Sequence, residues 1–105
     1  MDKIAMLSEI LKQNPADSFA RYGLAMAHLS DGNTDAALAE FSNTTDHNPD
    51  YVPAYQMSGQ TLARLHRNEE AKERLGRGLA AAQRTGNQHA ASEMQALLDE
   101  LELGY

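Results

Sequence analysis

The sequence predicts an all-α protein of about six helices joined by short connections. Three observations lead to this prediction. Apolar side chains recur at spacings of three and four residues along the chain, and no segment shows the alternation typical of a strand. Gly, Pro, Asn and Asp interrupt these runs at short intervals. The pattern also repeats: QNPAD at 13–17 returns as HNPDY at 47–51, so Pro15 and Pro49 are 34 residues apart.

The first helix is predicted over residues 2–13. Its apolar residues, which we expect to face inward, are Ile4, Leu7, Ile10 and Leu11. The second helix runs from Asp17, which can cap it, to about Ser30, and Gly32 can end it. A helix that is apolar on almost every side, as this one is, is normally buried on every side.

The second helix carries three strips of apolar or small residues. One strip is Phe19, Tyr22, Met26 and Leu29; a second is Ala20, Gly23 and Ala27; the third is Leu24 and Ala25. We expect the last two strips to pack against neighbouring helices. The first strip would then remain available for a different contact.

The third helix is predicted from about Thr34 to the end of the segment NTDAALAEFSNTTDH. Its apolar face carries Ala37, Leu38 and Phe41. Pro49 disfavours helix at the residue before it, and Pro53 suits a first helical turn. The fourth helix is therefore predicted from about Val52 to Leu65.

Asn68 can cap a fifth helix, predicted from Glu69 to about Arg84, because glutamates in the first turn suit the positive end of the helix. The segment TGN at 85–87 indicates one helix end followed by a helix start. The sixth helix, from 87 to about 102, has a single apolar face made of Ala90, Met94, Leu97, Leu98 and Leu101.

Composition limits the classes of function. With 105 residues, of which 42% are hydrophobic and 23% charged, the chain is expected to form one small folded domain. It has no cysteine, which suits a reducing compartment and excludes thiolate zinc sites. No segment has the apolar length of a signal peptide or a membrane span, so we expect a cytoplasmic protein with no membrane insertion.

Charge is unevenly distributed along the chain. The net charge of −6 disfavours nucleic acid as a partner. Residues 51–84 nevertheless contain six basic and three acidic side chains, whereas residues 85–105 contain acidic ones only. Solvated helix faces explain this most simply. The alternatives are orientation of an acidic partner or head-to-tail contact between copies.

The 34-residue period of paired helices resembles the tetratricopeptide repeat family. In the first repeat, the family's leucine, small, glycine, alanine, aromatic and proline positions hold Leu24, Ala25, Gly32, Ala37, Phe41 and Pro49. In the second repeat, matching positions hold Tyr55, Gly59, Ala71 and Leu75. The match covers residues 16 to 85.

Several positions depart from the repeat pattern. The family usually has an aromatic residue, a tyrosine, a turn glycine and a proline where this chain has Arg21, His28, His66 and Gln83. When the two repeats are aligned with each other, Ser58 opposite Leu24 is the main mismatch. These departures concern local packing and leave the predicted fold unchanged.

The resemblance implies a right-handed α-solenoid of antiparallel helix pairs. The single domain 1–105 would then consist of an N-terminal half-repeat helix (1–15), two repeats (16–51 and 52–85) and a C-terminal capping helix (86–105). In this family, the first helix of each repeat lines a concave groove that binds peptides or helices. The groove residues expected here are Phe19, Tyr22, Met26, Leu29, Gln56, Gln60, Arg64 and Met94.

The function implied is a non-enzymatic protein-interaction module that binds a helical or hydrophobic segment. The family also has a basic clamp for the C-terminal carboxylate of heat-shock chaperones. Its positions are occupied here by Tyr22, Met26, Met57, Asn87 and Ala91, so that ligand is not expected. Two alternatives remain open: a homodimer closed by the Phe19 strip, or a non-catalytic accessory subunit of an enzyme complex. The Phe19 strip could also be covered within the chain.

No residue pattern predicts catalysis, a metal or a cofactor. The four histidines lie in four different segments, at His28, His47, His66 and His89. The segment GRG at 76–78 lacks the preceding strand of a phosphate-binding loop. Gly78 is better explained by close packing between helices.

Overall fold

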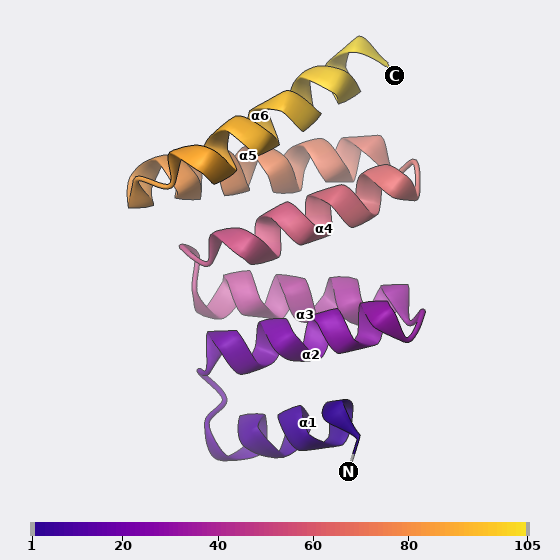
Figure 1. Cartoon of the computed structure of the whole chain (residues 1–105), viewed down its shortest axis with the longest axis vertical. Helices are drawn as coiled ribbons and strands as arrows, with labels where there is room; N and C mark the ends of the chain where they lie inside the picture. The colour runs from indigo at the N-terminus through magenta and orange to yellow at the C-terminus, as the bar shows by residue number, and fades with distance from the viewer. Residues whose placement is uncertain (1, 105) are drawn as a thin grey trace. The chain divides into compact units, whose positions relative to one another are not determined.

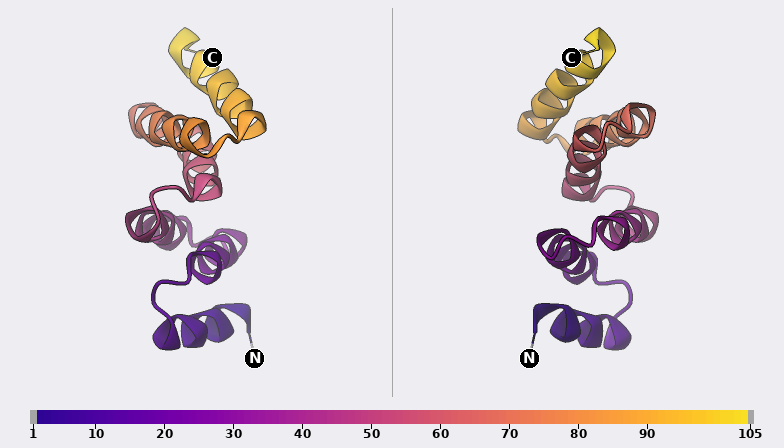
Figure 2. Two further views of the ribbon diagram at one scale, coloured as in Figure 1. Left: turned by 90° about the vertical axis from the view of Figure 1, so that its left-hand side faces the viewer. Right: turned by 90° about the vertical axis from the view of Figure 1, so that its right-hand side faces the viewer.

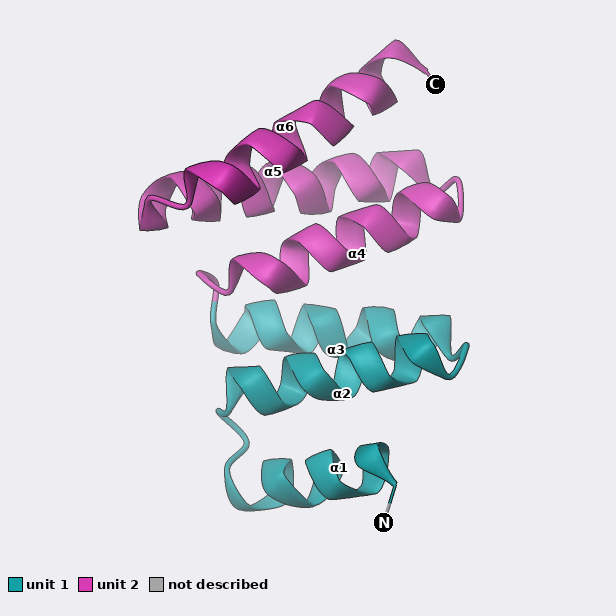
Figure 3. Cartoon of the chain, viewed as in Figure 1, with its two compact units in different colours: residues 1–48 teal, residues 49–105 magenta. Residues whose placement is uncertain are grey.

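The computed structural model describes residues 2–104 and contains six α-helices there (Figure 1). No residue in this range belongs to a strand, which confirms the predicted all-α fold. The chain divides into two compact units, residues 1–48 and residues 49–105 (Figure 3). The first unit contains α1 (Lys3–Gln13), α2 (Ser18–Ser30) and α3 (Thr34–His47). The second contains α4 (Val52–Arg64), α5 (Asn68–Thr85) and α6 (Gln88–Leu103).

Three predicted caps are confirmed. Asp17 precedes α2, and its carboxylate accepts a hydrogen bond of 2.9 Å from the backbone N–H of Ala20. Gly86 ends α5 with a left-handed backbone, at φ 73°. Asn87 then caps α6, because its side chain accepts from the N–H of Ala90 at 3.1 Å. Each signal is local, so each could be recognised from a few residues.

The predicted cap of α5 is wrong by one residue. Asn68 is the first residue of the helix, and Arg67 holds the cap position without a capping hydrogen bond from its side chain. Arg67 instead forms an ion pair with Glu70 in the first turn. The hydrogen bond from Arg67 lowers the pKa of Glu70 below its ordinary value.

His66 replaces the turn glycine of the second repeat. Its backbone is left-handed, at φ 59°, as is that of Gly32 at the matching position of the first repeat, at φ 80°. A side chain in this region of φ costs about 1–2 kcal/mol relative to ordinary helical backbone. The turn geometry is therefore kept in the second repeat with local strain.

In the first unit, α1 packs on α2. Leu11 forms a cluster with Ala20 and Leu24, and Ile4 and Leu7 pack against it. Ile10, predicted to face inward, is 40% exposed. The reason is that α2 covers only one stripe of α1, and Ile10 lies beside that stripe.

The packing strips predicted for α2 are buried except at Gly23, which is half-buried. Ala20, Leu24, Ala25 and Ala27 are each at most 8% exposed. Within the first unit α2 lies beside α3, and within the second unit α4 lies beside α5 (Figure 2). Ala37, Phe41, Ala71 and Leu75, the small and large positions of the repeat, are fully buried.

Arg21 and Tyr55 occupy matching positions in the two repeats and make matching contacts. Arg21 donates to the carbonyl oxygen of Pro15 at 3.0 Å, and the Tyr55 hydroxyl donates to that of Pro49 at 2.9 Å. Arg21 also forms an ion pair of 3.1 Å with Glu40. The arginine therefore replaces the usual aromatic residue in tying the helix to the preceding turn.

The structure of the second unit explains why Ser58 stands where the first repeat has Leu24. Ser58 is 2% exposed, and its hydroxyl accepts a hydrogen bond of 3.2 Å from the guanidinium of Arg74. The same guanidinium lies 5.0 Å from the centre of the Tyr55 ring. A leucine at position 58 would leave this buried guanidinium without its hydroxyl acceptor, because a buried charge needs polar partners.

Candidate functional site

The strip of Phe19, Tyr22, Met26 and Leu29 on α2 is only partly exposed to solvent. Phe19 is 78% exposed, whereas Tyr22, Met26 and Leu29 are half-buried. The Tyr22 ring packs against the ring of Phe41, with centroids 5.8 Å apart and planes inclined by 48°. Tyr22 therefore contributes to the packing of the first unit, and Phe19 is the exposed member of the strip.

Met26 lines a cavity of about 410 Å³ within the first unit. The cavity is lined by the beginning of α1 and the end of α2. Asp2 and Asp31 line it together with Lys3, so its walls carry charges of both signs. Phe19, Tyr22 and Leu29 do not line it. The four residues of the strip thus do not share one pocket.

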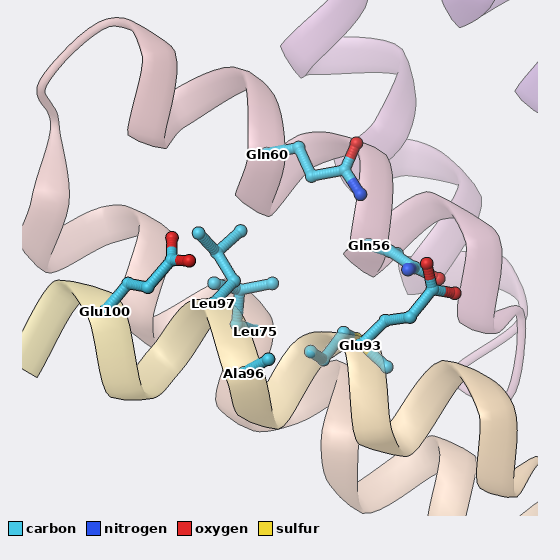
Figure 4. Close-up of a pocket in the computed structure, with 8 residues that line it drawn as sticks. Gln56, Gln60, Leu75, Glu93, Ala96, Leu97 and Glu100 are labelled. Atoms are coloured by element: carbon cyan, nitrogen blue, oxygen red, sulfur yellow. The ribbon is translucent and has the colours of Figure 1, made fainter.

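A cavity of about 290 Å³ lies within the second unit, between α4 and α6 (Figure 4). Two of the predicted residues, Gln56 and Gln60, form its α4 wall. Figure 4 shows their amides extending toward the space between the two helices. The other lining residues are Leu75 of α5 and Glu93, Met94, Ala96, Leu97 and Glu100 of α6.

Close helix packing holds the floor of this pocket in place. A Cβ atom added to Gly78 would lie 2.5 Å from the Cβ of Tyr55 and 2.7 Å from the sulfur of Met94. A Cβ atom added to Gly59 would lie 2.5 Å from a methyl carbon of Leu75. The two glycines therefore let α5 approach α4, and Gly78 also lets it approach α6. The prediction that Gly78 serves close packing is confirmed.

The two other residues predicted for the groove in the second unit, Met94 and Arg64, are placed differently from Gln56 and Gln60. Met94 lines the pocket, but it is only 1% exposed, so it does so as a core residue. Arg64 is exposed and does not line the pocket. Its guanidinium lies 3.5 Å from the hydroxyl of Thr61.

Sequence reasoning missed Glu93 and Glu100, which complete the α6 wall. They are seven residues apart, and Leu97 lies between them. The spacing itself was a usable signal, because residues separated by three, four and seven positions share a helix face. What the sequence did not show is that this face of α6 lies beside α4.

Most basic side chains of α5 are already paired within the second unit. Within the helix, Lys72 pairs with Glu69 and Arg77 pairs with Glu73. Arg84 of α5 pairs with Asp50, which precedes α4. The helix α6 contains four acidic residues and no lysine or arginine. Glu93 contacts His89 at 3.0 Å and Glu102 contacts Lys72 at 3.8 Å, and Glu100 is in none of the ion pairs found within residues 2–104.

Within residues 2–104, no group of three or more His, Asp or Glu side chains is placed to hold a metal ion. In the same range, no helix combines the length and apolar character needed to cross a membrane. The pocket between α4 and α6 offers amide and carboxylate groups above an apolar floor. Such a surface can hold an apolar side chain and hydrogen-bond to polar groups beside it.

Comparison with known proteins gives a family match. The sequence matches the family model described as tetratricopeptide repeat over residues 4–57 and again over 28–98. A tetratricopeptide repeat domain protein from Salinibacter ruber, solved by NMR, is 35% identical. The alignment covers 88% of this chain and 93% of that chain, with a TM-score of 0.80.

Two further solved structures are similar. A protein from Bordetella parapertussis is 28% identical, with a TM-score of 0.78 over 97% of this chain and 89% of that chain. The TPR2B domain of yeast Sti1, solved in complex with pHsp70, is 19% identical, with a TM-score of 0.86 over 97% of this chain and 82% of that chain. At that identity the likeness concerns the fold alone. No protein with a curated description matches the sequence.

Proposed function

This chain belongs to the tetratricopeptide repeat family, whose domains generally mediate protein–protein interaction, and we propose that it binds a helical or hydrophobic segment of another protein without chemistry of its own. The observation that carries the proposal is the pocket between α4 and α6. It combines the amides of α4 with the apolar side chains of Leu75 and Leu97, and so can take up an apolar side chain of a partner.

The size of the pocket supports a side chain as the occupant. Small-molecule sites are usually cavities of about 300–1,000 Å³ that enclose most of their ligand. At about 290 Å³, the pocket in Figure 4 lies just below that range. An anchor side chain on a longer segment would fill it while the rest of the segment lies across α4 and α6.

The strip on α2 is a second, separate surface in the proposal. Phe19 offers a large apolar side chain that is 78% exposed. Exposed aromatic residues often become anchors at protein interfaces when a partner excludes water from them. Tyr22, Met26 and Leu29, the other members of this strip, are half-buried.

The test is affinity capture from a lysate of the source cells, with partners quantified by mass spectrometry. Ala96→Trp places a large side chain at the pocket, since Ala96 is exposed and lines it. Ala80→Trp is the matched control, since Ala80 is exposed on α5 and does not line the pocket. Phe19→Glu tests the α2 strip separately.

We expect the wild type and Ala80→Trp to retain the same dominant partner, and Ala96→Trp to lose most of it. Equal capture by all variants would show that the pocket is not the binding surface. Light scattering over a concentration series distinguishes the homodimer. Self-association that Phe19→Glu or Ala96→Trp abolishes, with no other protein retained, would replace the proposal by a self-associating unit.

A further inference from the structure

The α6 wall of the pocket has a defined spacing of charge. Glu93, Leu97 and Glu100 lie at intervals of four and three residues, so the two carboxylates bracket the leucine on one helix face. Seven residues correspond to about 10.5 Å along a helix axis. In Figure 4 the two glutamates extend from α6 on either side of Leu97, toward the space below α4.

The charge at this wall is available to a partner. Glu93 is half-exposed, with 51% of its side chain accessible, and its one ion-pair contact within residues 2–104 is with His89, which is charged only when protonated. Glu100 is exposed and belongs to no ion pair in the same range. The α4 wall facing them has two neutral amides. The nearest cation along α4 is Arg64, one turn beyond Gln60 and outside the lining.

We propose that the segment bound in this pocket is an α-helix with two basic side chains two turns apart and an aliphatic side chain between them. This inference rests on the proposed function and names the chemistry of the partner. The aliphatic side chain enters the pocket beside Leu97, and the two cations pair with Glu93 and Glu100. A helix repeats the same axial distance over seven residues, so both pairs form at once when the two helices lie side by side.

The chemistry distinguishes this partner from an acidic one. Three basic residues of α5 form ion pairs with carboxylates of their own unit: Lys72 with Glu69, Arg77 with Glu73 and Arg84 with Asp50. An acidic segment would have to displace those carboxylates, and it would meet two further carboxylates at the pocket. A basic segment meets charge of the opposite sign, at Glu100 and at Glu93, whose contact in the protein is with His89.

The experiment measures binding of labelled peptides by fluorescence anisotropy. The probe is an alanine-based helical peptide with two lysines two turns apart and a leucine midway. Two control peptides carry glutamate or glutamine in place of lysine. The protein variants are Glu93→Gln/Glu100→Gln and the matched control Asp99→Asn/Glu102→Gln, which removes the same charge from α6 at residues that do not line this pocket.

We expect the lysine peptide to bind more tightly than either control peptide. Glu93→Gln/Glu100→Gln should weaken its binding about three- to tenfold, in line with two partly exposed ion pairs, and Asp99→Asn/Glu102→Gln should weaken it less than twofold. Higher salt should reduce the difference. Arg64→Gln should strengthen binding slightly, because it removes the nearest cation along α4.

The outcomes separate the two proposals. If the glutamate or glutamine peptide binds as well as the lysine peptide, or if both double variants lose affinity equally, the basic partner is refuted and the binding module stands. If no peptide binds, and Ala96→Trp also leaves lysate capture unchanged, both proposals fail. If the protein self-associates and Glu93→Gln/Glu100→Gln abolishes that association, the occupant is a second copy and the proposed partner is wrong.

Discussion

Replacing Gly78 with alanine should destabilise the protein, and the same replacement at Gly76 should stabilise it. Both glycines lie inside α5 and differ in what surrounds them. A Cβ atom at Gly78 would meet Tyr55 at 2.5 Å and Met94 at 2.7 Å, whereas a Cβ atom at Gly76 would meet nothing within 4 Å. Comparing the two substitutions therefore separates the packing cost of the added methyl group from the effect of alanine on helix propensity.

The magnitude follows from two opposing terms. Alanine is favoured over glycine by about 1 kcal/mol inside a helix, and this gain applies at both positions. Overpacking a full core costs about 1–3 kcal/mol, and the upper end applies at Gly78 because the Cβ of Tyr55 is tied to its backbone and cannot rotate away. We expect Gly78→Ala to lose about 2 kcal/mol and Gly76→Ala to gain about 1 kcal/mol.

Thermal and urea unfolding followed by circular dichroism measures both variants. For a chain of this length, 1 kcal/mol corresponds to about 5 °C in Tm, so the two variants should differ by about 15 °C. Equal stabilisation by both substitutions would refute the reasoning. It would mean that α5 does not approach α4 and α6 closely enough at Gly78 for a methyl group to be excluded.

Three further predictions concern single contacts. His66→Gly should stabilise the protein by about 0.5–1 kcal/mol in urea unfolding, because relief of the left-handed strain exceeds the added chain entropy; a loss of stability would contradict the strain. Arg21→Tyr should destabilise by about 2 kcal/mol by leaving Glu40 without its cation, and Arg21→Tyr/Glu40→Arg should recover part of that loss by copying the tyrosine–arginine pair of the second repeat; a double variant no more stable than the single one would argue against the equivalence. In an NMR titration, Arg67→Ala should raise the pKa of Glu70 toward its ordinary value. A carboxyl group whose pKa is lowered by folding stabilises the fold at pH values above its unfolded pKa, and this contribution is lost on acidification. The difference in stability between the wild type and Arg67→Ala should therefore disappear at low pH. An unchanged pKa of Glu70 in Arg67→Ala would exclude the hydrogen bond as the cause of the shift.

The helices could be predicted from the sequence because their signals are local. Asp17, Gly86 and Asn87 act at the helix ends where they were expected, through contacts with backbone only a few residues away. The predicted cap at Asn68 failed because a capping residue and a first-turn residue have similar preferences, and nothing nearby distinguishes them. Such errors shift a helix end and leave the fold unchanged.

Contacts between helices were harder to predict. The repeat comparison marked Ser58 as an exception, and only the position of Arg74 across the helix pair explains it. Glu93 and Glu100 had the spacing of one helix face, which by itself also fits a solvated surface. They become walls of a pocket because α6 lies beside α4. Ile10 illustrates the reverse case, an apolar residue that was expected to face inward and that packing within its unit leaves 40% exposed.

The most direct test of the binding account is an NMR titration of the ¹⁵N-labelled protein with the lysine peptide. We expect the largest shift changes at residues lining the pocket, above all Gln56, Gln60 and Leu97, and little change at Ala80. Ala96→Trp should abolish these changes. Shift changes centred away from the residues that line the pocket, or changes that persist in Ala96→Trp, would contradict the assignment of the pocket as the binding surface.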